Sequence, residues 1–479
     1  MAEKEKLPEA LPAKKDDFSK WYNIVLEAAG LLDKRYNVKG CFVWLNYGYE
    51  AMLNIKAKWD KEFKSNGYKE MYFPLLVPKE YAEINDAWWN GFKSQAFWVK
   101  GLDEPEATHI LRPTGEPAMY PMFNLWIRSY NDLPLRIYET VSSFRYETGH
   151  TRPIIRDREI TVWYEIHTCH TTREESEQEI IKHMEMIDKV WEACALVPLK
   201  VNKPEWECFP GAVGAVEYYS LMPNGKAMEN GSFNNLGQAY AKKFDIKFRD
   251  KDEKEKYVWM TCTGNGARIL AAFVGEHGDD KGLVIPPEIA PVHAVIVPIY
   301  NQETKDEVVK HSQKLFEKLK KDFRMEIDLR EIRPGAKFYD WELKGVPLRV
   351  EVGPKDIKEK SVVLVRRDNG KKEKVKETDL DKEIKKLLDD IQKSMYENAK
   401  KNFTSRIIDA KSKDEIKKAI DAKKTAKIYW CKSGECWDEI KAIMEGIEMF
   451  GTDLKPAKEG KCAVCGKSTT TIGYVANTY

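Results

Sequence analysis

The stretch that decides the fold is FRYETGHTRPIIRDREI, residues 144–160. The segments on its two sides, LRIYETVSSFRYE (135–147) and REITVWYEIH (158–167), have the composition of strands, and the second shows period-two alternation. Such alternation is the pattern of a half-buried strand, and a turn-rich segment between two strands is typical of a loop. The sequence therefore predicts a strand, a charged loop and a second strand, which together form a hairpin.

Arg145 and Glu147 are two residues apart, so a strand places both side chains on one face. A guanidinium keeps its charge at any relevant pH and can hold a carboxylate or phosphate through two hydrogen bonds. A nearby glutamate could accept from an amino or adenine N–H group. R-x-E is also the pattern of an ordinary structural ion pair, so these two residues alone leave both interpretations open.

Three further segments surround the hairpin. Residues 44–64 have helical apolar spacing, and MYFPLLVP (71–78) resembles a strand with Pro74 inside it. A proline within a strand belongs at an edge or an interface. After the hairpin, TGNGARILAAFVGEHGDD (263–280) is a Gly-rich element in which Arg268 opens a helix. Both arginines thus belong to one region, before a proline-rich break.

That break is PPEIAP, residues 286–291, which predicts a domain boundary. VHAVIVPIY (292–300) then has the character of a buried strand, and short strands alternate with helices as far as about residue 395. This order is typical of a compact α/β domain. The predicted organisation is a flexible arm (1–18), a first domain (19–288), an α/β domain (289–395) and a small C-terminal domain (396–479).

The C-terminal domain contains two cysteine pairs, Cys431-x4-Cys436 and Cys462-x2-Cys465, with 25 residues between them. Two short-spaced pairs can form a tetrahedral tetrathiolate site, typically for zinc. Four thiolates leave no open position for a catalytic water, so the sequence favours a structural zinc site. Four free thiols are the alternative.

The 479 residues suggest about three domains, and 42% hydrophobic residues suffice for a sizeable core. The net charge of +2 excludes a uniformly basic nucleic-acid coat protein. The charge is unevenly distributed, because residues 301–479 carry 41 Lys+Arg against 33 Asp+Glu.

The start of the chain has no apolar signal segment, and no apolar run approaches the ~20 residues that span a bilayer. We therefore expect no membrane contact and a cytoplasmic location, where cysteines stay reduced.

Taken in order, these elements resemble the three signature motifs of class II aminoacyl-tRNA synthetases. Several longer stretches, among them LRPTGEPAMYPMFNLWI, NKPEWECFPGA and PGAKFYDWELKGVPLRVEVGPKD, are similar to prolyl-tRNA synthetases of the archaeal/eukaryotic type. The resemblance extends from about residue 20 to Tyr479. It implies an α+β fold: a catalytic domain on an antiparallel sheet, an α/β anticodon-binding domain and a zinc-binding C-terminal α+β domain.

The resemblance also implies an activity, the ATP-dependent ligation of proline to its tRNA through a prolyl-adenylate. ATP would be a substrate, with Mg²⁺ and structural Zn²⁺ as metals and a homodimer as the assembly.

The resemblance further assigns roles to single residues. Arg145 and Arg268 would be catalytic. Substrate-binding roles fall on Thr114, Glu116, Arg145, Trp163, Glu165, His167, Phe209 and Cys262. Contacts to ATP and magnesium fall on Arg145, Glu147, Arg156, Glu229, Ser232, Asn235 and Arg268. The anticodon guanines would be read by Glu342, Arg349 and Lys355, which offer suitable donors and an acceptor. The zinc ligands would be Cys431, Cys436, Cys462 and Cys465.

Some of these residues have a simpler explanation. Trp163 and Phe209 could be core aromatics, and His167 could be a core histidine. The chain also departs from the family around the pocket, with Gly115 inside the T-x-E loop and Val213 after the Gly-Ala of FPGA. Two alternatives therefore remain: a paralogue that charges a tRNA with another amino acid, and a catalytically impaired tRNA-binding relative. A ligase acting on a different carrier is disfavoured by the anticodon residues.

Overall fold

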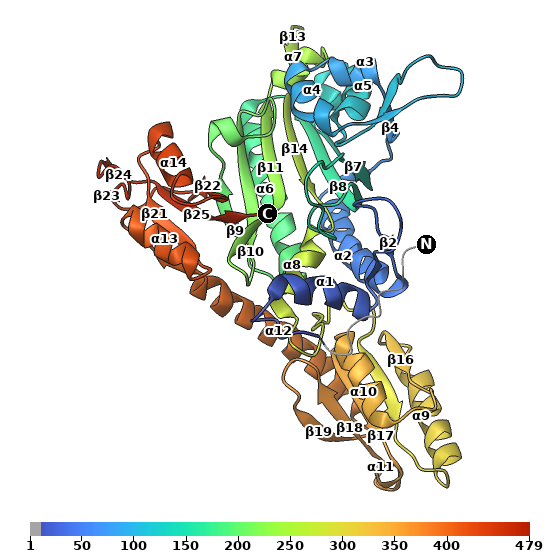
Figure 1. The fold of residues 1–479 in the computed structure, drawn as a ribbon. Helices are drawn as coiled ribbons and strands as arrows, with labels where there is room; N and C mark the ends of the chain where they lie inside the picture. The colour runs from blue at the N-terminus through green and yellow to red at the C-terminus, as the bar shows by residue number, and fades with distance from the viewer. Residues whose placement is uncertain (1–10) are drawn as a thin grey trace.

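The computed structural model describes residues 11–479 and is built around one large sheet (Figure 1). Its eleven strands follow the order β20-β21-β25-β22-β9-β10-β11-β14-β8-β7-β3. The predicted hairpin is confirmed, because β7 (Leu135–Phe144) pairs antiparallel with β8 (Glu159–His170). The other strands that the catalytic part contributes to this sheet are β3 (Lys69–Glu70), β9 (Leu199–Asn202), β10 (Gly214–Leu221), β11 (Lys226–Gly237) and β14 (Trp259–Asn265).

Alternation along β8 divides the sheet into a core face and a site face. Tyr164 packs on one side against Trp59 and Phe63 of α2 (Asn46–Ser65), the helix predicted from residues 44–64. Further helices of the catalytic part are α1 (Phe18–Ala28), α4 (Asp86–Phe92), α5 (Glu116–Trp126), α6 (Arg173–Ala193) and α8 (Arg268–His277). Trp163, Glu165 and His167 point to the opposite face, as period two requires. Helix α2 therefore covers the core face, and the opposite face carries the candidate site.

The second domain is the predicted α/β domain. Its five-stranded sheet has the order β16-β15-β17-β18-β19, and β15 is parallel to both β16 and β17. The strands are β15 (Ala294–Pro298), β16 (Met325–Ile327), β17 (Leu348–Val352), β18 (Ser361–Arg366) and β19 (Lys372–Lys376). The helices are α9 (Lys305–Leu319), α10 (Pro334–Leu343), α11 (Pro354–Lys358) and α12 (Leu380–Ser405). All five residues of β15 are buried, which explains its uninterrupted apolar sequence.

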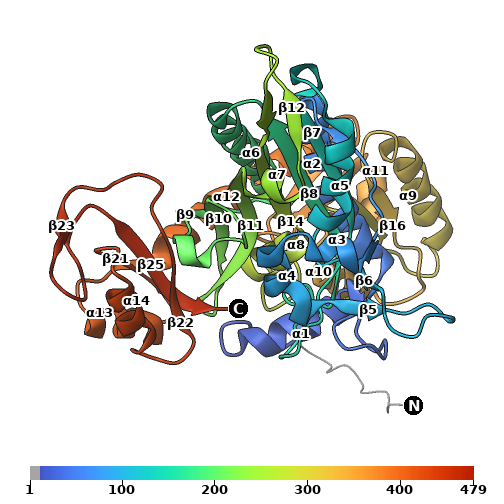
Figure 2. The same ribbon diagram turned by 90° about the horizontal axis from the view of Figure 1, so that it is seen from above.

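The C-terminal part extends the catalytic sheet with four of its strands and adds a separate two-stranded sheet, β23 (Gly460–Lys461) and β24 (Ser468–Thr469) (Figure 2). Strand β22 (Ile447–Thr452) meets β9, and β25 (Ile472–Thr478) runs parallel to the start of β11. The remaining elements are β20 (Ile407–Asp409), β21 (Thr425–Tyr429), α13 (Lys413–Asp421) and α14 (Gly434–Lys441). Helix α12 runs without a break through the predicted boundary at residues 395–396. Catalytic and C-terminal parts are thus joined through a shared sheet.

Of the predicted N-terminal arm, residues 1–10 lie outside the described residues. The next segment is folded against the catalytic part, because the Lys14 ammonium donates to the Gly278 carbonyl at 2.5 Å. Helix α1 then begins at Phe18, where the Asp17 side chain caps it by accepting from the Lys20 amide. Within residues 11–479, no helix combines the length and apolar composition needed to cross a membrane.

Candidate active site

A cavity of about 260 Å³ opens on the site face of the large sheet. It gathers side chains from β8, β10, β11 and β14, from the hairpin loop and from the loop before β10. The predicted residues among its lining are Thr114, Glu116, Arg145, Glu147, Arg156, Trp163, Glu165, Phe209, Glu229, Ser232, Cys262 and Arg268. Residues from six separate stretches of sequence therefore converge on one hollow, which a set of unrelated core residues would not do.

Two arginines supply fixed positive charge to this cavity. The Arg145 guanidinium lies 5.3 Å from the ring of Trp163 and 5.7 Å from that of Phe92, and its Nε donates to the Pro113 carbonyl at 3.4 Å. Arg268 is anchored through its Nε to the Ile155 carbonyl at 2.7 Å and through a terminal nitrogen to that of Glu229 at 3.1 Å. Backbone carbonyls hold both, so within residues 11–479 neither charge is neutralised by a bonded carboxylate and both can receive an anion.

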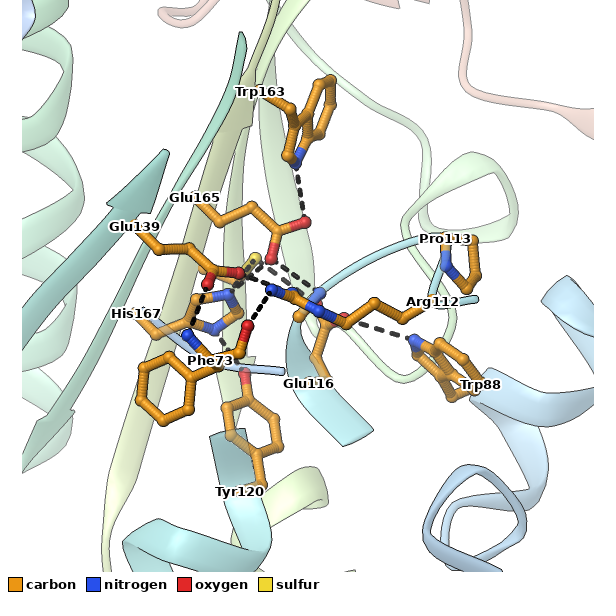
Figure 3. A network of polar contacts seen from close by, with 12 residues as sticks. Phe73, Trp88, Arg112, Pro113, Glu116, Tyr120, Glu139, Trp163, Glu165 and His167 are labelled. Carbon is orange, nitrogen blue, oxygen red and sulfur yellow. Dashed lines mark hydrogen bonds and ion pairs between the residues drawn. The ribbon is translucent and has the colours of Figure 1, made fainter. Parts of the chain in front are cut away.

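A buried network of carboxylates borders the cavity (Figure 3). Glu165 accepts from the Trp163 indole at 2.7 Å and from the Gly115 amide at 2.6 Å, and it lies 3.2 Å from His167 Nε2. Below it, Arg112 pairs with Glu139 at 2.5 Å, with both side chains fully buried. Glu165 is thus a scaffold that orients the strand and the 114–116 loop.

Thr114 and Glu116 occupy that loop and face the cavity. The Thr114 hydroxyl is buried with no hydrogen-bond partner among the described residues. One Glu116 oxygen accepts from the Trp88 indole at 3.2 Å, while the other lies 3.5 Å from Cys262 Sγ. An unpartnered buried hydroxyl is costly, so its partner is expected to be a bound molecule.

Glu116 and Glu165 lie close together in a buried site, and their mutual repulsion disfavours ionisation of both carboxyl groups at once. Burial and the adjacent Glu165 raise the pKa of Glu116 to about 7. Burial alone would lower the pKa of His167, but its hydrogen bond to Glu165 and the nearby Glu116 raise it. The site therefore holds protons near neutral pH in the absence of a cationic ligand.

Close packing explains the departure at Gly115 and the glycines in the segment before Arg268. A Cβ on Gly115 would lie 2.3 Å from a Glu165 oxygen, so that position must stay small for the amide to reach the carboxylate. Cβ atoms on Gly264 and Gly266 would lie 2.9 and 2.8 Å from the Trp163 ring. The glycines in the segment before Arg268 therefore make room for the Trp163 ring over the sheet.

The acidic wall is built by β10 and β11. A bulge with Gly231 at φ +142° puts Glu229 and Ser232 on one face, where the Ser232 hydroxyl donates to Glu217 at 2.9 Å. Asn234 also lines the cavity, whereas Asn235 does not, because its side chain accepts from the Gly237 amide at 2.9 Å. The structure thus brings Asn234 to the site in place of the predicted Asn235.

Of the remaining predicted residues, one lies behind the cavity lining and one at the rim of the cavity. His167 lies behind the lining and is fully buried, with Nδ1 2.9 Å from the Tyr120 hydroxyl. Arg156, at the rim, donates to the carbonyl of the last residue, Tyr479, at 3.1 Å and lies 4.0 Å from Glu147. The chain's own C-terminus thus contacts the hairpin loop.

Several residues of the site carry no local sequence signal. Arg112, Glu139, Glu217 and Asp157 were missed because each is an ordinary charged residue until the fold buries it, and Lys203, half-buried beside Glu229, was missed for the same reason. Glu217 is the most informative, because one of its carboxylate oxygens is buried without a partner in the described part of the chain. The sequence shows only that Glu217 precedes two tyrosines, Tyr218 and Tyr219. In the structure both tyrosines are buried.

The four clustered cysteines meet as the spacing predicted. Cys431 Sγ lies 3.6 Å from both Cys436 Sγ and Cys465 Sγ, and all four sulfurs lie within 4.8 Å of one another. Zinc–sulfur bonds of ~2.3 Å in a tetrahedron place sulfurs ~3.7 Å apart. The donor set therefore fits zinc.

Two of the three predicted anticodon residues line a second cavity, of about 280 Å³, in the α/β domain. Arg349 pairs with Glu342 at 3.1 Å and with Glu351 at 3.0 Å. Lys355, on α11, does not line this cavity.

Known families and solved structures match this chain in sequence and in fold. Models of the class II tRNA synthetase core domain (G, H, P, S and T), the anticodon binding domain and the prolyl-tRNA synthetase C-terminal domain match residues 97–277, 293–387 and 413–479. The Pyrococcus abyssi proline–tRNA ligase is 40% identical over 97% of this chain and 98% of its own length, and that of Methanosarcina mazei is 40% identical over the full length of both. A solved structure, Giardia lamblia prolyl-tRNA synthetase in complex with prolyl-adenylate, superposes with a TM-score of 0.94 at 34% identity, covering 98% of this chain and 100% of that one.

Fold and site together define a class II aminoacyl-tRNA synthetase. Within that class the relatives are more specific, since they share the whole chain, including the C-terminal domain. The chain belongs to the prolyl-tRNA synthetase family.

Proposed function

We propose that this protein joins proline to its tRNA in two steps, through an enzyme-bound prolyl-adenylate. The observation that carries the proposal is one cavity lined by Arg145 and Arg268 and also by Thr114, whose hydroxyl has no partner among the described residues, and Glu116. An amino acid fits this polarity, because its ammonium meets Thr114 and Glu116 while its carboxylate points to Arg145.

In the first step, a carboxylate oxygen of proline attacks the α-phosphorus of ATP, and the bond from that phosphorus to pyrophosphate breaks. The charge on the phosphoryl oxygens grows, and fixed guanidinium groups such as Arg145 and Arg268 stabilise it without reorganising. In the second step, a ribose hydroxyl of the tRNA attacks the adenylate carbonyl and releases AMP. No side chain needs to form a covalent bond, so catalysis rests on position and charge.

Glu229 and Glu217 are the residues that would hold Mg²⁺. Both carboxylates line the cavity, and the unpartnered Glu217 oxygen gives a hard cation the ligand it prefers. Burial and the neighbouring Glu229 raise the pKa of Glu217 well above its usual range, as expected where two carboxylates await a cation. When bound, Mg²⁺ would neutralise the phosphates of ATP.

The test is ATP–pyrophosphate exchange with each of the twenty amino acids, followed by charging of total tRNA. We expect exchange with proline and charging of proline tRNA. Exchange with a different amino acid would instead identify a paralogue. Absence of exchange with all twenty would favour the tRNA-binding relative and contradict the proposal.

The pKa of Glu116 makes amino-acid binding depend on pH. Its ionised form pairs with the ammonium, and that form is lost as pH falls through about 7. We expect the KM for proline to be about tenfold higher at pH 6 than at pH 8, with a smaller effect on kcat. Glu116→Gln should raise KM and flatten this profile, whereas a profile that stays steep in the variant would contradict the assignment.

Anticodon recognition should be separable from adenylate formation. Glu342→Gln keeps the side-chain volume but removes the charge that can accept two guanine N–H groups. We expect kcat/KM for tRNA charging to fall about tenfold to a hundredfold, with pyrophosphate exchange unchanged. Glu326→Gln, on the exposed part of β16, is the matched control. An equal loss in both variants would contradict the role of Glu342.

We infer that the protein is a homodimer. Beside Pro74, Tyr72 and Leu76 are 73% and 44% exposed, and Trp98 and Leu125 are 45% and 54% exposed. Large apolar side chains exposed together are typical of an interface. Sedimentation equilibrium should give twice the chain mass of 55.5 kDa, and a monomer at micromolar concentration would contradict the inference.

We also propose domain boundaries at residues 288–289 and 395–396, the second of which falls within helix α12. The four C-terminal cysteines would bind the zinc. We expect the protein in the cytoplasm. The nine cysteines, all within the described residues, form no disulfide, which supports a reducing compartment.

A further inference from the structure

We propose that Glu116, His167 and Cys262 form a second metal site, which binds a thiophilic divalent cation such as Zn²⁺ and thereby blocks the amino-acid end of the cavity. The proposal deepens the proposed function, because the same residues would receive the ammonium of the substrate. It concerns ligands on three separate elements: the start of α5, strand β8 and strand β14.

The three donors are already at metal-binding separations. Cys262 Sγ lies 3.5 Å from Glu116 Oε1 and 3.8 Å from His167 Nε2, and all three donor atoms lie within 4.8 Å of one another. Bonds of ~2.3 Å to sulfur and ~2.0–2.1 Å to oxygen and nitrogen give donor–donor distances of ~3.5 Å in a tetrahedron. A zinc ion therefore fits between these atoms with only small side-chain shifts.

The register of the sheet fixes this arrangement. Cys262 and His167 are direct partners across β14 and β8, so their side chains emerge side by side on the same face. Glu116 approaches from the first turn of α5. All three residues are buried, at 1%, 0% and 6% exposure for Glu116, His167 and Cys262, so water competes little for the donors.

Each imidazole and carboxylate ligand also has an outer partner. His167 Nδ1 lies 2.9 Å from the Tyr120 hydroxyl, and the second Glu116 oxygen accepts from the Trp88 indole at 3.2 Å. Such partners orient metal ligands and leave the inner atoms free for the ion. Metal binding would use the lone pair of His167 Nε2, which lies 3.2 Å from Glu165, and would displace the Cys262 thiol proton.

The fourth position faces the cavity, which both Glu116 and Cys262 line. Three protein ligands with one open position are typical of exchangeable or catalytic zinc, in contrast to the closed set of four cysteines in the C-terminal part. An ion there would occupy the place of the substrate ammonium. Metal and amino acid would therefore compete, and zinc would act as a reversible inhibitor.

The first experiment measures metal binding directly on the full-length protein with its C-terminal zinc in place. Wild type, Cys262→Ala and the control Cys169→Ala are dialysed against buffered free Zn²⁺, and bound zinc is counted by mass spectrometry. Cys169 is a buried thiol two residues after His167 on β8 and is not one of the proposed ligands. We expect wild type and Cys169→Ala to bind one more zinc per chain than Cys262→Ala. Equal zinc in all three proteins would overturn the metal site.

Co²⁺ added to the same proteins is a spectroscopic probe. A thiolate-to-cobalt charge-transfer band beyond that of the C-terminal site should appear in wild type and be absent from Cys262→Ala. Thermal unfolding of the variants shows whether each is folded, so a missing band in a folded variant is informative. The same band in Cys262→Ala would contradict the assigned thiolate.

The second experiment tests competition in ATP–pyrophosphate exchange with free zinc buffered. At zinc ten times its inhibition constant, the KM for proline should rise about elevenfold with kcat unchanged. Added zinc that binds without raising KM would overturn the blocking role. Absence of proline-dependent exchange before zinc is added would contradict the proposed function instead, while the metal count would still decide the site.

Discussion

Replacing Arg145 by alanine is expected to reduce pyrophosphate exchange about a thousandfold, a loss of ~4 kcal/mol in transition-state stabilisation. Arg145 lines the same cavity as Glu116 and Arg268, and its guanidinium is held against the rings of Trp163 and Phe92. Removing the side chain therefore removes both a fixed positive charge and one wall of the cavity. The effect should fall mainly on kcat, because the phosphoryl charge develops in the transition state.

Two controls separate chemistry from folding in this experiment. Arg145→Lys keeps the charge but loses the planar fork, so it should recover only part of the rate. Arg249→Ala removes an exposed arginine on β12 (Lys247–Arg249), outside the cavity lining, and should exchange like wild type. Exchange by Arg145→Ala at the wild-type rate would contradict the assigned role.

The hairpin could be predicted because its information is local. Alternation along β8 sends Tyr164 to the core and Glu165 to the site, and the turn-rich loop lies between two strands that pair as expected. The cysteine site was predictable for the same reason: spacing within each pair limits where the sulfurs can be. Strand alternation and cysteine spacing are set by residues close in sequence, so packing against distant parts of the chain does not change what they predict.

The bulge in β11 shows where local reasoning fails. Simple alternation would place Glu229 and Ser232 on opposite faces, and only the extra residue at Gly231 brings both to the cavity. The same bulge decides that Asn234, and not Asn235, faces the site. A one-residue shift of register reverses every side chain after it, and nothing in the sequence marks it except a glycine.

Long-range burial could not be predicted at all. Arg112 lies in the loop before α5 and Glu139 lies 27 residues later on β7, yet they form a fully buried ion pair under the amino-acid end of the cavity. Their exposed or buried state depends on how α5 and β7 pack. The contact between Arg156 and the carbonyl of Tyr479 likewise requires the C-terminal strands to join the catalytic sheet.

Loss of the zinc proposed at the four C-terminal cysteines is expected to reach the amino-acid site through a cluster of three tryptophans. Trp430 precedes Cys431, Trp437 follows Cys436, and their rings lie 5.9 Å apart. Trp206, from the loop before β10, packs edge-on against them at 6.2 and 5.7 Å. Cys208 and Phe209 in that loop line the cavity, so its position depends on the folded cysteine site.

Cys436→Ala should therefore release the zinc and unfold the 430–465 region. Structural zinc contributes about 10–16 kcal/mol to small isolated zinc domains, so the loss here should exceed that of an ordinary buried-cysteine change. We expect an earlier thermal transition, a red shift of tryptophan fluorescence and a severalfold rise in the KM for proline. Proteolysis should begin after α12, while the catalytic and α/β domains remain resistant.

Cys194→Ala removes a fully buried thiol outside the cluster and is the control for cavity formation alone. It should keep its zinc and its KM, and lose only the stability of one small side chain. Trp206→Ala isolates the link between the two sites: it should keep the zinc but raise the KM for proline, because the cavity loop loses its support. If Cys436→Ala loses its zinc and both it and Trp206→Ala keep a wild-type KM, the tryptophan cluster does not connect the metal to the amino-acid site.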